Sequence, residues 1–308
     1  MNSSNREKEL KKYILKYRLY LYLAVAIAVV LVLPLLFLIK NILVSYIVMI
    51  LLVYFCALKG VRIAFGKSIY PIFGKNLDVD TFLEVIYSGN FGSGFHIWQL
   101  FGEYYCGNYQ NVIGICKENM DNPKFYKKCK YTYLIYQANV YFDVGDDENL
   151  SLILEQYHKI LETENHKKQK KIRSAFTVME LFKKYLERDI DACIELRNKH
   201  VPRNDIERYM SAFRRAKLEF LSENIDKARE NYELLAKSVP QLNYGKLAAK
   251  YLEKIESQEC NKDNFCLDKI EECNVVPHLS VKPLIKKLSV ISICCGVLLL
   301  CLYFFVFN

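Results

Sequence analysis

The residue types that most often carry catalysis are present in this sequence, but they are scattered along it. The five histidines are His96, His158, His166, His200 and His278. None of them belongs to an H-E-x-x-H pattern, and none has a clear nucleophile and acid as partners. Acid–base and covalent catalysis both require such groups to be held together in one site. The sequence therefore predicts a protein that is not an enzyme and that uses no cofactor.

Two groups of side chains have the chemistry of metal ligands without the spacing. The first comprises Cys260, Cys266, Cys273 and His278, with gaps of five, six and four residues. Structural zinc sites usually contain a C-x2–4-C pair, which is missing here. The acids from Asp143 to Glu148 resemble part of a calcium loop but lack its Gly and Glu. We interpret the thiols as unpaired and the acids as a helix start, where they suit the helix dipole. No metal site is predicted.

Two glycine-containing segments suggest phosphate binding only weakly. Gly66-Lys67-Ser68 resembles the end of a Walker A loop, but Val61 occupies the position of the first required glycine. We interpret Gly66-Lys67-Ser68 as part of a basic segment that lies next to a membrane-spanning run. The segment Gly89–Gly94 is not preceded by a strand, so it is interpreted as a turn that enters a helix around Trp98.

Three apolar runs are the most distinct elements of the chain. They are Leu19–Ile39, Ile42–Leu58 and Leu288–Phe307, and none contains Asp, Glu, Lys, Arg or His. As a helix the first run would be about 31 Å long, close to the hydrocarbon thickness of a bilayer. We expect an N-terminal transmembrane hairpin and a C-terminal transmembrane helix. The second run has 17 residues, near the lower limit for a full span, so a partly re-entrant segment is the alternative. The lack of ionisable groups argues against a transporter or pump.

The charge pattern predicts the orientation of these spans. Residues 1–75 have a net charge of +9, residues 76–281 of −3 and residues 282–308 of +3. A nucleic-acid-binding protein would place the basic excess on its folded region instead. The basic flanks agree with a cytoplasmic N-terminus and middle region. The 11 cysteines, scattered without paired spacing, suit a reducing compartment. We therefore expect a multi-pass cell-membrane protein, and its short loops suggest a bacterial inner membrane.

The middle region has a helical apolar period and a suggestion of repeats. Trp98-x2-Phe101-Gly102-x2-Tyr105 matches the W-x2-L-G-x2-Y opening of the tetratricopeptide (TPR) repeat, which the chain resembles over about residues 94–240. A second match is formed by Ala216, Ala228, Tyr232 and Pro240, whose spacings of 12, 4 and 8 are those of the family. The resemblance implies an all-α, TPR-like solenoid of antiparallel helix pairs, in which small residues allow close approach. A helix at Asp78–Tyr87 and a capping helix at Leu242–Glu256 are expected to flank it. An unrelated helical bundle is the alternative.

The resemblance also implies a concave face that binds a protein or peptide. The corresponding positions are His96, Gln99 and Glu103 in the first unit, Ile135 and Asn139 in the second, and Lys183 and Lys217 in the third and fourth. Glu103 would repel a terminal carboxylate, which argues against a chaperone clamp. The acidic segment 76–121 favours a basic or neutral partner. The cluster Lys167, Lys168, Lys170, Lys171 and Arg173 is interpreted as a solvated helix face, with anionic lipid or an acidic peptide as the alternative.

These expectations give a division of the chain and a hypothesis for its function. The predicted segments are a basic N-terminus (1–18), two transmembrane helices (19–58), a juxtamembrane basic segment (59–75), a cytoplasmic TPR-like domain (76–257), a linker (258–287) and a transmembrane helix (288–307). The hypothesis is a membrane-anchored scaffold or adaptor that binds a protein or peptide partner, with no nucleic acid and no small-molecule substrate. The alternative is an accessory subunit of a membrane export or envelope-assembly complex, in which the spans make the main contacts.

Overall fold

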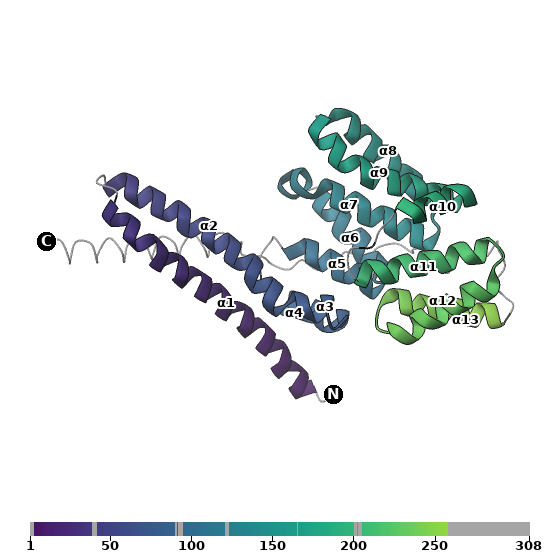
Figure 1. Cartoon of the computed structure of the whole chain (residues 1–308), viewed down its shortest axis with the longest axis horizontal. Helices are drawn as coiled ribbons and strands as arrows, with labels where there is room; N and C mark the ends of the chain where they lie inside the picture. The colour runs from purple at the N-terminus through teal and green to yellow at the C-terminus, as the bar shows by residue number, and fades with distance from the viewer. Residues whose placement is uncertain are drawn as a thin grey trace. The chain divides into compact units, whose positions relative to one another are not determined.

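The computed structural model describes residues 3–38, 42–89, 91, 95–120, 123–164, 166–199, 202 and 205–257. Every regular element in these ranges is a helix, so the expected all-α class is confirmed for them (Figure 1). The third apolar run, the linker before it and the candidate zinc ligands lie outside the described residues, as does most of the segment Gly89–Gly94. The described chain divides into two compact units, unit 1 ending at Gln99 and unit 2 beginning at Leu100. The predicted domain start at residue 76 thus falls inside unit 1.

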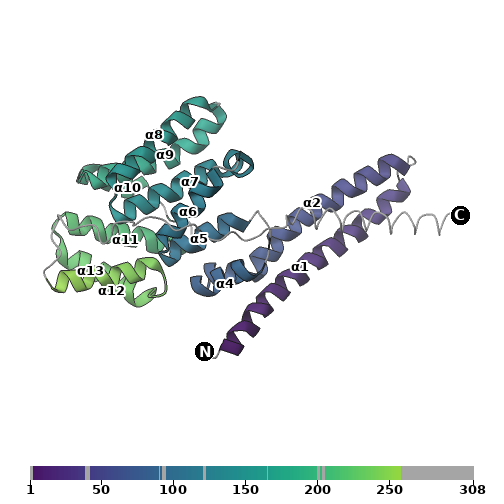
Figure 2. The ribbon, with the colours of Figure 1, turned by 180° about the vertical axis from the view of Figure 1, so that it is seen from behind.

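Unit 1 is built on a hairpin of two long helices, α1 (Ser3–Leu38) and α2 (Ile42–Ser68), which lie side by side in both views (Figures 1 and 2). Small residues set the close approach of the two helices. A Cβ atom added to Gly60 would lie only 2.7 Å from the Cβ of Ala24. Ala57 is buried against Val25 at the same interface. The first two predicted apolar runs therefore form a helical hairpin.

The hairpin exposes much of its apolar surface. Exposed large apolar side chains on α1 and α2 are Leu15, Leu19, Tyr22, Leu23, Ile27, Val30, Leu31, Val44, Ile47, Leu51, Phe55, Leu58 and Ile63. By length and composition, Asn5–Leu31 in α1 is the one stretch among the described residues that qualifies as a membrane-crossing helix. The other two predicted spans stay predictions. Gly66-Lys67-Ser68 lies within the continuous helix α2, so it forms no phosphate-binding loop.

Two shorter helices, α3 (Tyr70–Gly74) and α4 (Val79–Ser88), complete the packing around the base of the hairpin. Asp78 caps α4, because its carboxylate accepts a 3.0 Å hydrogen bond from the backbone N–H of Thr81. This confirms the helix expected at Asp78–Tyr87. An exposed ion pair of 2.6 Å joins Arg6 of α1 to Glu84 of α4. The charged start of α1 is therefore tied to α4.

Unit 2 contains the end of α5 (His96–Cys106) and eight further helices among the described residues. These are α6 (Tyr109–Met120), α7 (Pro123–Val144), α8 (Asp147–Thr163), α9 (His166–Leu186), α10 (Ile190–Lys199), α11 (Asp205–Leu221), α12 (Ile225–Ser238) and α13 (Asn243–Glu256). Pro123 occupies the first position of α7, where its missing N–H costs nothing. The helix α13 confirms the one expected at Leu242–Glu256, with a start one residue later.

From α6 to α13, helices that follow one another in the sequence pack together, and α7 also contacts α9 while α11 contacts α13. Ala216 and Ala228, predicted at the close contact between two helices, are both fully buried in the adjacent helices α11 and α12. Several side-chain contacts join helices that are not neighbours in the sequence, and the most distant of those described here joins Tyr104 of α5 to Tyr244 of α13 across 140 residues. In an open stack each repeat contacts only its neighbours. Unit 2 instead joins its first helix to its last.

Candidate functional site

A group of polar side chains in the described interior of unit 2 is centred on Asp143, in the last turn of α7. Asp143 is only 5% exposed. Its Oδ2 accepts hydrogen bonds from the hydroxyl of Tyr104 at 2.7 Å and from the hydroxyl of Tyr109 at 3.2 Å. The two donors come from α5 and α6, so one carboxylate links three helices. A buried carboxylate needs such donors to replace the water it has lost.

Two residues at the start of α13 complete this network. The hydroxyl of Tyr244 shares a 2.6 Å hydrogen bond with the hydroxyl of Tyr104, and Nδ2 of Asn243 donates to the hydroxyl of Tyr109 at 2.5 Å. We name Tyr104, Tyr109, Asp143, Asn243 and Tyr244 the Asp143 cluster. The cluster fastens α13 to the opposite end of the unit.

The turn between α5 and α6 depends on a glycine beside the cluster. Gly107 has φ +87°, a left-handed conformation that side chains other than glycine rarely adopt. A Cβ atom at this position would also come within 2.3 Å of Oδ1 of Asn243. Both backbone geometry and space therefore require glycine where α13 approaches this turn.

A buried lysine lies next to the cluster. Lys217 of α11 is 1% exposed, and its Nζ donates to the backbone carbonyl of Asp143 at 3.3 Å. The same ammonium lies 5.5 Å from the ring centre of Phe142, 5.3 Å from that of Phe213 and 5.8 Å from that of Tyr251. Cation–π contacts of this kind replace part of the hydration that a buried ammonium loses.

Arg214, one turn before Lys217 on α11, joins three helices. Its Nη2 donates to Oδ1 of Asn139 on α7 at 2.6 Å. Its guanidinium carbon lies 4.5 Å from the ring centre of Phe182 on α9 and 5.3 Å from that of Phe142 on α7. Two cations and one carboxylate thus occupy the contact between α11 and α7.

Burial controls the protonation of the cluster tyrosines. It raises the pKa of Tyr104, Tyr109 and Tyr244 well above the usual value, and the nearby Asp143 raises each of them further. The phenols are therefore protonated at neutral pH and act as hydrogen-bond donors. The cluster therefore holds α5, α6, α7 and α13 together through hydrogen bonds between side chains.

The structure buries three of the residues predicted for a partner-binding face. Gln99, at the end of unit 1, donates to the hydroxyl of Tyr87 at 2.7 Å. Glu103 accepts from Nδ2 of Asn108 at 2.6 Å and from Nδ2 of Asn111 at 3.2 Å, both just beyond its own helix. Lys217 is the third. These three side chains are engaged inside the fold instead of lying on an open face.

The other four predicted residues keep part of their surface exposed. They are His96 and the residues Ile135, Asn139 and Lys183. The amide of Asn139 donates to the carbonyl of Ile135 at 2.7 Å while its oxygen binds Arg214. Asn139 and Lys183 belong to α7 and α9, which pack together. Of the predicted set, the structure brings Asn139 and Lys217 to the same junction of α7 and α11.

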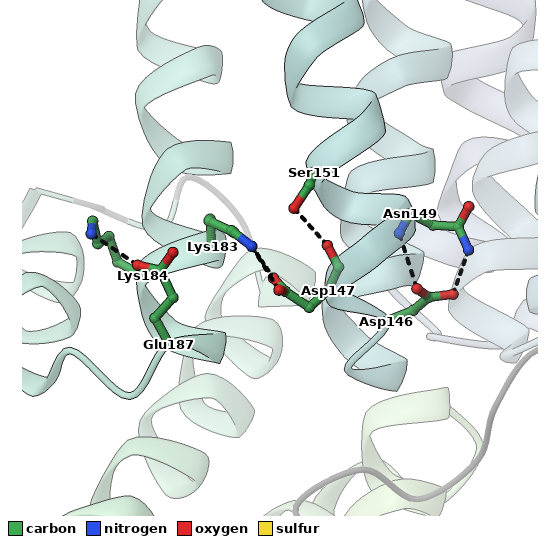
Figure 3. Close-up of polar contacts among 7 residues, drawn as sticks. All are labelled: Asp146, Asp147, Asn149, Ser151, Lys183, Lys184 and Glu187. Carbon is green, nitrogen blue, oxygen red and sulfur yellow. Dashed lines mark hydrogen bonds and ion pairs between the residues drawn. The ribbon is translucent and has the colours of Figure 1, made fainter.

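Figure 3 shows Lys183 at the end of α9, where its Nζ lies 2.6 Å from both carboxylate oxygens of Asp147 on α8. The same view shows Asp146 capping α8, with hydrogen bonds from the backbone N–H of Asn149 at 3.0 Å and from its side chain at 2.7 Å. The acidic segment predicted to be a helix start is therefore confirmed as one. In the described part of the chain no three His, Cys, Asp or Glu side chains are grouped to hold a metal.

Sequence reasoning missed most of the Asp143 cluster, although two signals pointed toward it. Asp143 interrupts an apolar run between Val140 and Val144, where a charged residue is unusual unless it is paired. Arg214 and Lys217 lie three residues apart on an otherwise apolar face of α11. A charge on an apolar face is the pattern that a buried polar contact produces.

The side chains of Lys167, Lys168, Lys170 and Lys171 in the predicted basic cluster lie outside those described, and only Arg173 is seen to be exposed. Comparison with known proteins gives no relative: no family model, no curated protein and no solved structure matches the chain.

Proposed function

We propose that this protein is a membrane-anchored scaffold or adaptor, in which an apolar helical hairpin holds a stack of helix pairs at the cytoplasmic face, where the stack binds a protein or peptide partner. The observation that carries the proposal is the contrast between two surfaces. The hairpin exposes large apolar side chains along both α1 and α2, whereas the described helices of unit 2 bury most of theirs and expose Leu152, Ile190, Ile194, Ile225 and Leu234. An exposed apolar surface of this extent requires lipid or another protein to cover it.

The anchoring half of the proposal rests on length and composition. Asn5–Leu31 is long and apolar enough to cross a bilayer, and α2 continues the apolar surface beside it. The basic residues before and after the hairpin favour a cytoplasmic location for unit 2. Holding a partner at a membrane raises its effective concentration there.

The binding half rests on the junction around Arg214. This residue joins α7, α9 and α11, and the half-exposed Ile135, Asn139 and Lys183 lie on two of these helices. A half-exposed polar and aromatic junction between packed helices has the composition of a peptide-binding face. In this proposal a partner contacts the exposed parts of α7 and α9, while Lys217 supports α7 from inside through its bond to the backbone of Asp143.

Site-directed photo-crosslinking in intact membranes tests the binding face. A photoreactive residue at Asn139 or Lys183 of the full-length chain is expected to capture the same partner. Leu234, 61% exposed on α12, is the matched control and is expected to capture nothing specific. Adducts from Leu234 alone would refute the proposed face. Adducts from Phe55 on the hairpin, with none from α7 or α9, would favour the accessory-subunit alternative.

Protease accessibility tests the orientation. Protease added outside intact cells or spheroplasts is expected to leave unit 2 undigested, and permeabilisation is expected to expose it. Digestion of unit 2 in sealed spheroplasts would refute the cytoplasmic placement.

A further inference from the structure

The base of the hairpin carries a ring of positive charge. Lys16 and Arg18 on α1 and Lys59, Arg62 and Lys67 on α2 are all exposed. We name these five residues the basic collar. No Asp or Glu occurs in the sequence between Glu9 and Asp78, and the carboxylate of α4 that pairs with α1, Glu84, does so at Arg6, nearer the N-terminus than the collar.

The packing of α1 on α2 brings the five collar residues into the same part of the hairpin. Gly60 lies opposite Ala24, and the two helices run antiparallel from that point (Figure 1). With a rise of about 1.5 Å per residue, the five basic residues fall within about 14 Å along the hairpin axis. Lys16 and Arg18 are separated by about 200° around α1, so they reach opposite flanks of the hairpin. The charges therefore surround the hairpin instead of forming a single patch.

The collar lies one bilayer thickness from the far end of the hairpin. From Lys59 back to Ile42 the helix α2 extends for about 26 Å, close to the hydrocarbon thickness of a membrane. That length exposes Val44, Ile47, Leu51 and Phe55. Tyr22, 60% exposed, lies at the collar level, where aromatic side chains prefer the headgroup region. Long basic side chains reach outward to the same region while their stems stay on apolar surface.

We propose that the basic collar is a binding surface for anionic phospholipid headgroups, which it enriches in the cytoplasmic leaflet. The proposal rests on the membrane placement in the proposed function and specifies the lipid that the hairpin recruits. The occupant is a lipid because the charges form a ring directly below an exposed apolar surface. Acyl chains then contact α1 and α2 while the phosphate group meets the cations. Each basic residue near an anionic surface favours anionic over neutral lipid about five-fold.

Fluorescence quenching by brominated lipids measures this preference at a chosen depth. The full-length protein carries one tryptophan, Trp98, which is replaced by Phe so that a single reporter can be introduced. Leu58→Trp places the reporter beside the collar, and Val44→Trp places it at the opposite end of α2. Both native side chains are exposed, at 37% and 46%. Each protein is reconstituted in phosphatidylcholine vesicles that contain phosphatidylglycerol, with bromine on the chains of one lipid or the other.

The expected result is a preference of about five-fold or more for brominated phosphatidylglycerol at position 58 and no preference at position 44. Replacing Lys59 and Arg62 with Gln is expected to reduce the preference at position 58 at least two-fold, and salt at about 1 M is expected to weaken it as well. Equal quenching by both lipids at position 58 would overturn the collar while leaving the membrane placement intact. Absence of quenching by either lipid at both positions would overturn the placement itself. Native mass spectrometry of lipids retained by the unmodified protein gives a second readout, and retention of phosphatidylglycerol no greater than that of phosphatidylcholine would overturn the proposal.

Discussion

Replacing Asp143 with Ala removes the acceptor at the centre of the polar network in unit 2. Tyr104 and Tyr109 would both lose the oxygen to which they donate, at 2.7 and 3.2 Å. A buried donor left without its acceptor costs about 1–3 kcal/mol. Two such donors predict a loss of about 2–6 kcal/mol in the free energy of unfolding. Because a domain of this size loses about 2–4 °C of melting temperature per kcal/mol, we expect a decrease of roughly 8–16 °C for the middle of that range.

The assay is thermal unfolding of the full-length chain in detergent micelles, followed by far-ultraviolet circular dichroism. Asp147→Ala is the matched control, because it deletes the same carboxylate four residues away. Asp147 is half exposed and pairs with Lys183 at 2.6 Å. An exposed ion pair contributes about 0–1 kcal/mol, so the control is expected to shift the melting temperature by no more than about 4 °C. Asp143→Asn keeps one acceptor oxygen and is expected to lie between the two.

Equal melting temperatures for the Asp143→Ala and Asp147→Ala variants would refute the reasoning. They would mean either that the phenols find other acceptors at no cost or that α13 is not fastened through this cluster. A large effect of Asp147→Ala alone would place the important carboxylate at the start of α8 instead.

Three further predictions concern other parts of the fold. The cluster tyrosines titrate near pH 10 when unfolded but at a higher pKa when folded, so raising the pH above 10 deprotonates the unfolded chain first. The free energy of unfolding should then fall by about 1.4 kcal/mol per pH unit for each such tyrosine, and urea titrations between pH 9 and 11 should be less steep in pH for Tyr104→Phe. Gly107→Ala is expected to cost at least about 2 kcal/mol in thermal unfolding, because φ is +87° and the new Cβ would overlap Asn243. Gly60→Val is expected to cost about 1–3 kcal/mol by forcing α1 from α2, since its Cβ would lie 2.7 Å from that of Ala24. Gly66→Ala, whose Cβ meets nothing within 4 Å, is the control for both and should be neutral or stabilising; glycine variants indistinguishable from it would contradict the packing described.

Local sequence signals located several helices of this protein correctly. Asp78 predicts the start of α4 because a carboxylate at that position accepts from the backbone N–H groups of the first turn, and the structure places it there. Pro123 begins α7, the helix position at which proline is tolerated best. The apolar period beyond Leu242 predicts α13 to within one residue. These signals involve atoms within one or two turns of each other, so neighbouring residues suffice to determine them.

The predicted binding residues show where local patterns stop being sufficient. Gln99, Glu103 and Lys217 occupy positions that the resemblance to the TPR repeat assigns to a concave binding face, yet all three are buried. For Glu103 the reason is local, since Asn108 and Asn111 at the next turn donate to its carboxylate. For Lys217 the reason is distant, because the residues that cover it include Tyr251 of α13 and Phe142 of α7. The sequence of one helix indicates which way a side chain points, but it does not indicate which other helices pack over that side chain.

The sequence by itself determined the helical class of the described chain, the apolar hairpin and its basic base, because each follows from residue type and spacing along a single helix or a pair of adjacent helices. Only the tertiary structure decided that Tyr104 and Tyr244, 140 residues apart, share a hydrogen bond and that Asp143 accepts hydrogen bonds from both Tyr104 and Tyr109. The physical reason is that a buried carboxylate is stable only where donors replace its water, and those donors come from helices that the order of residues does not place side by side.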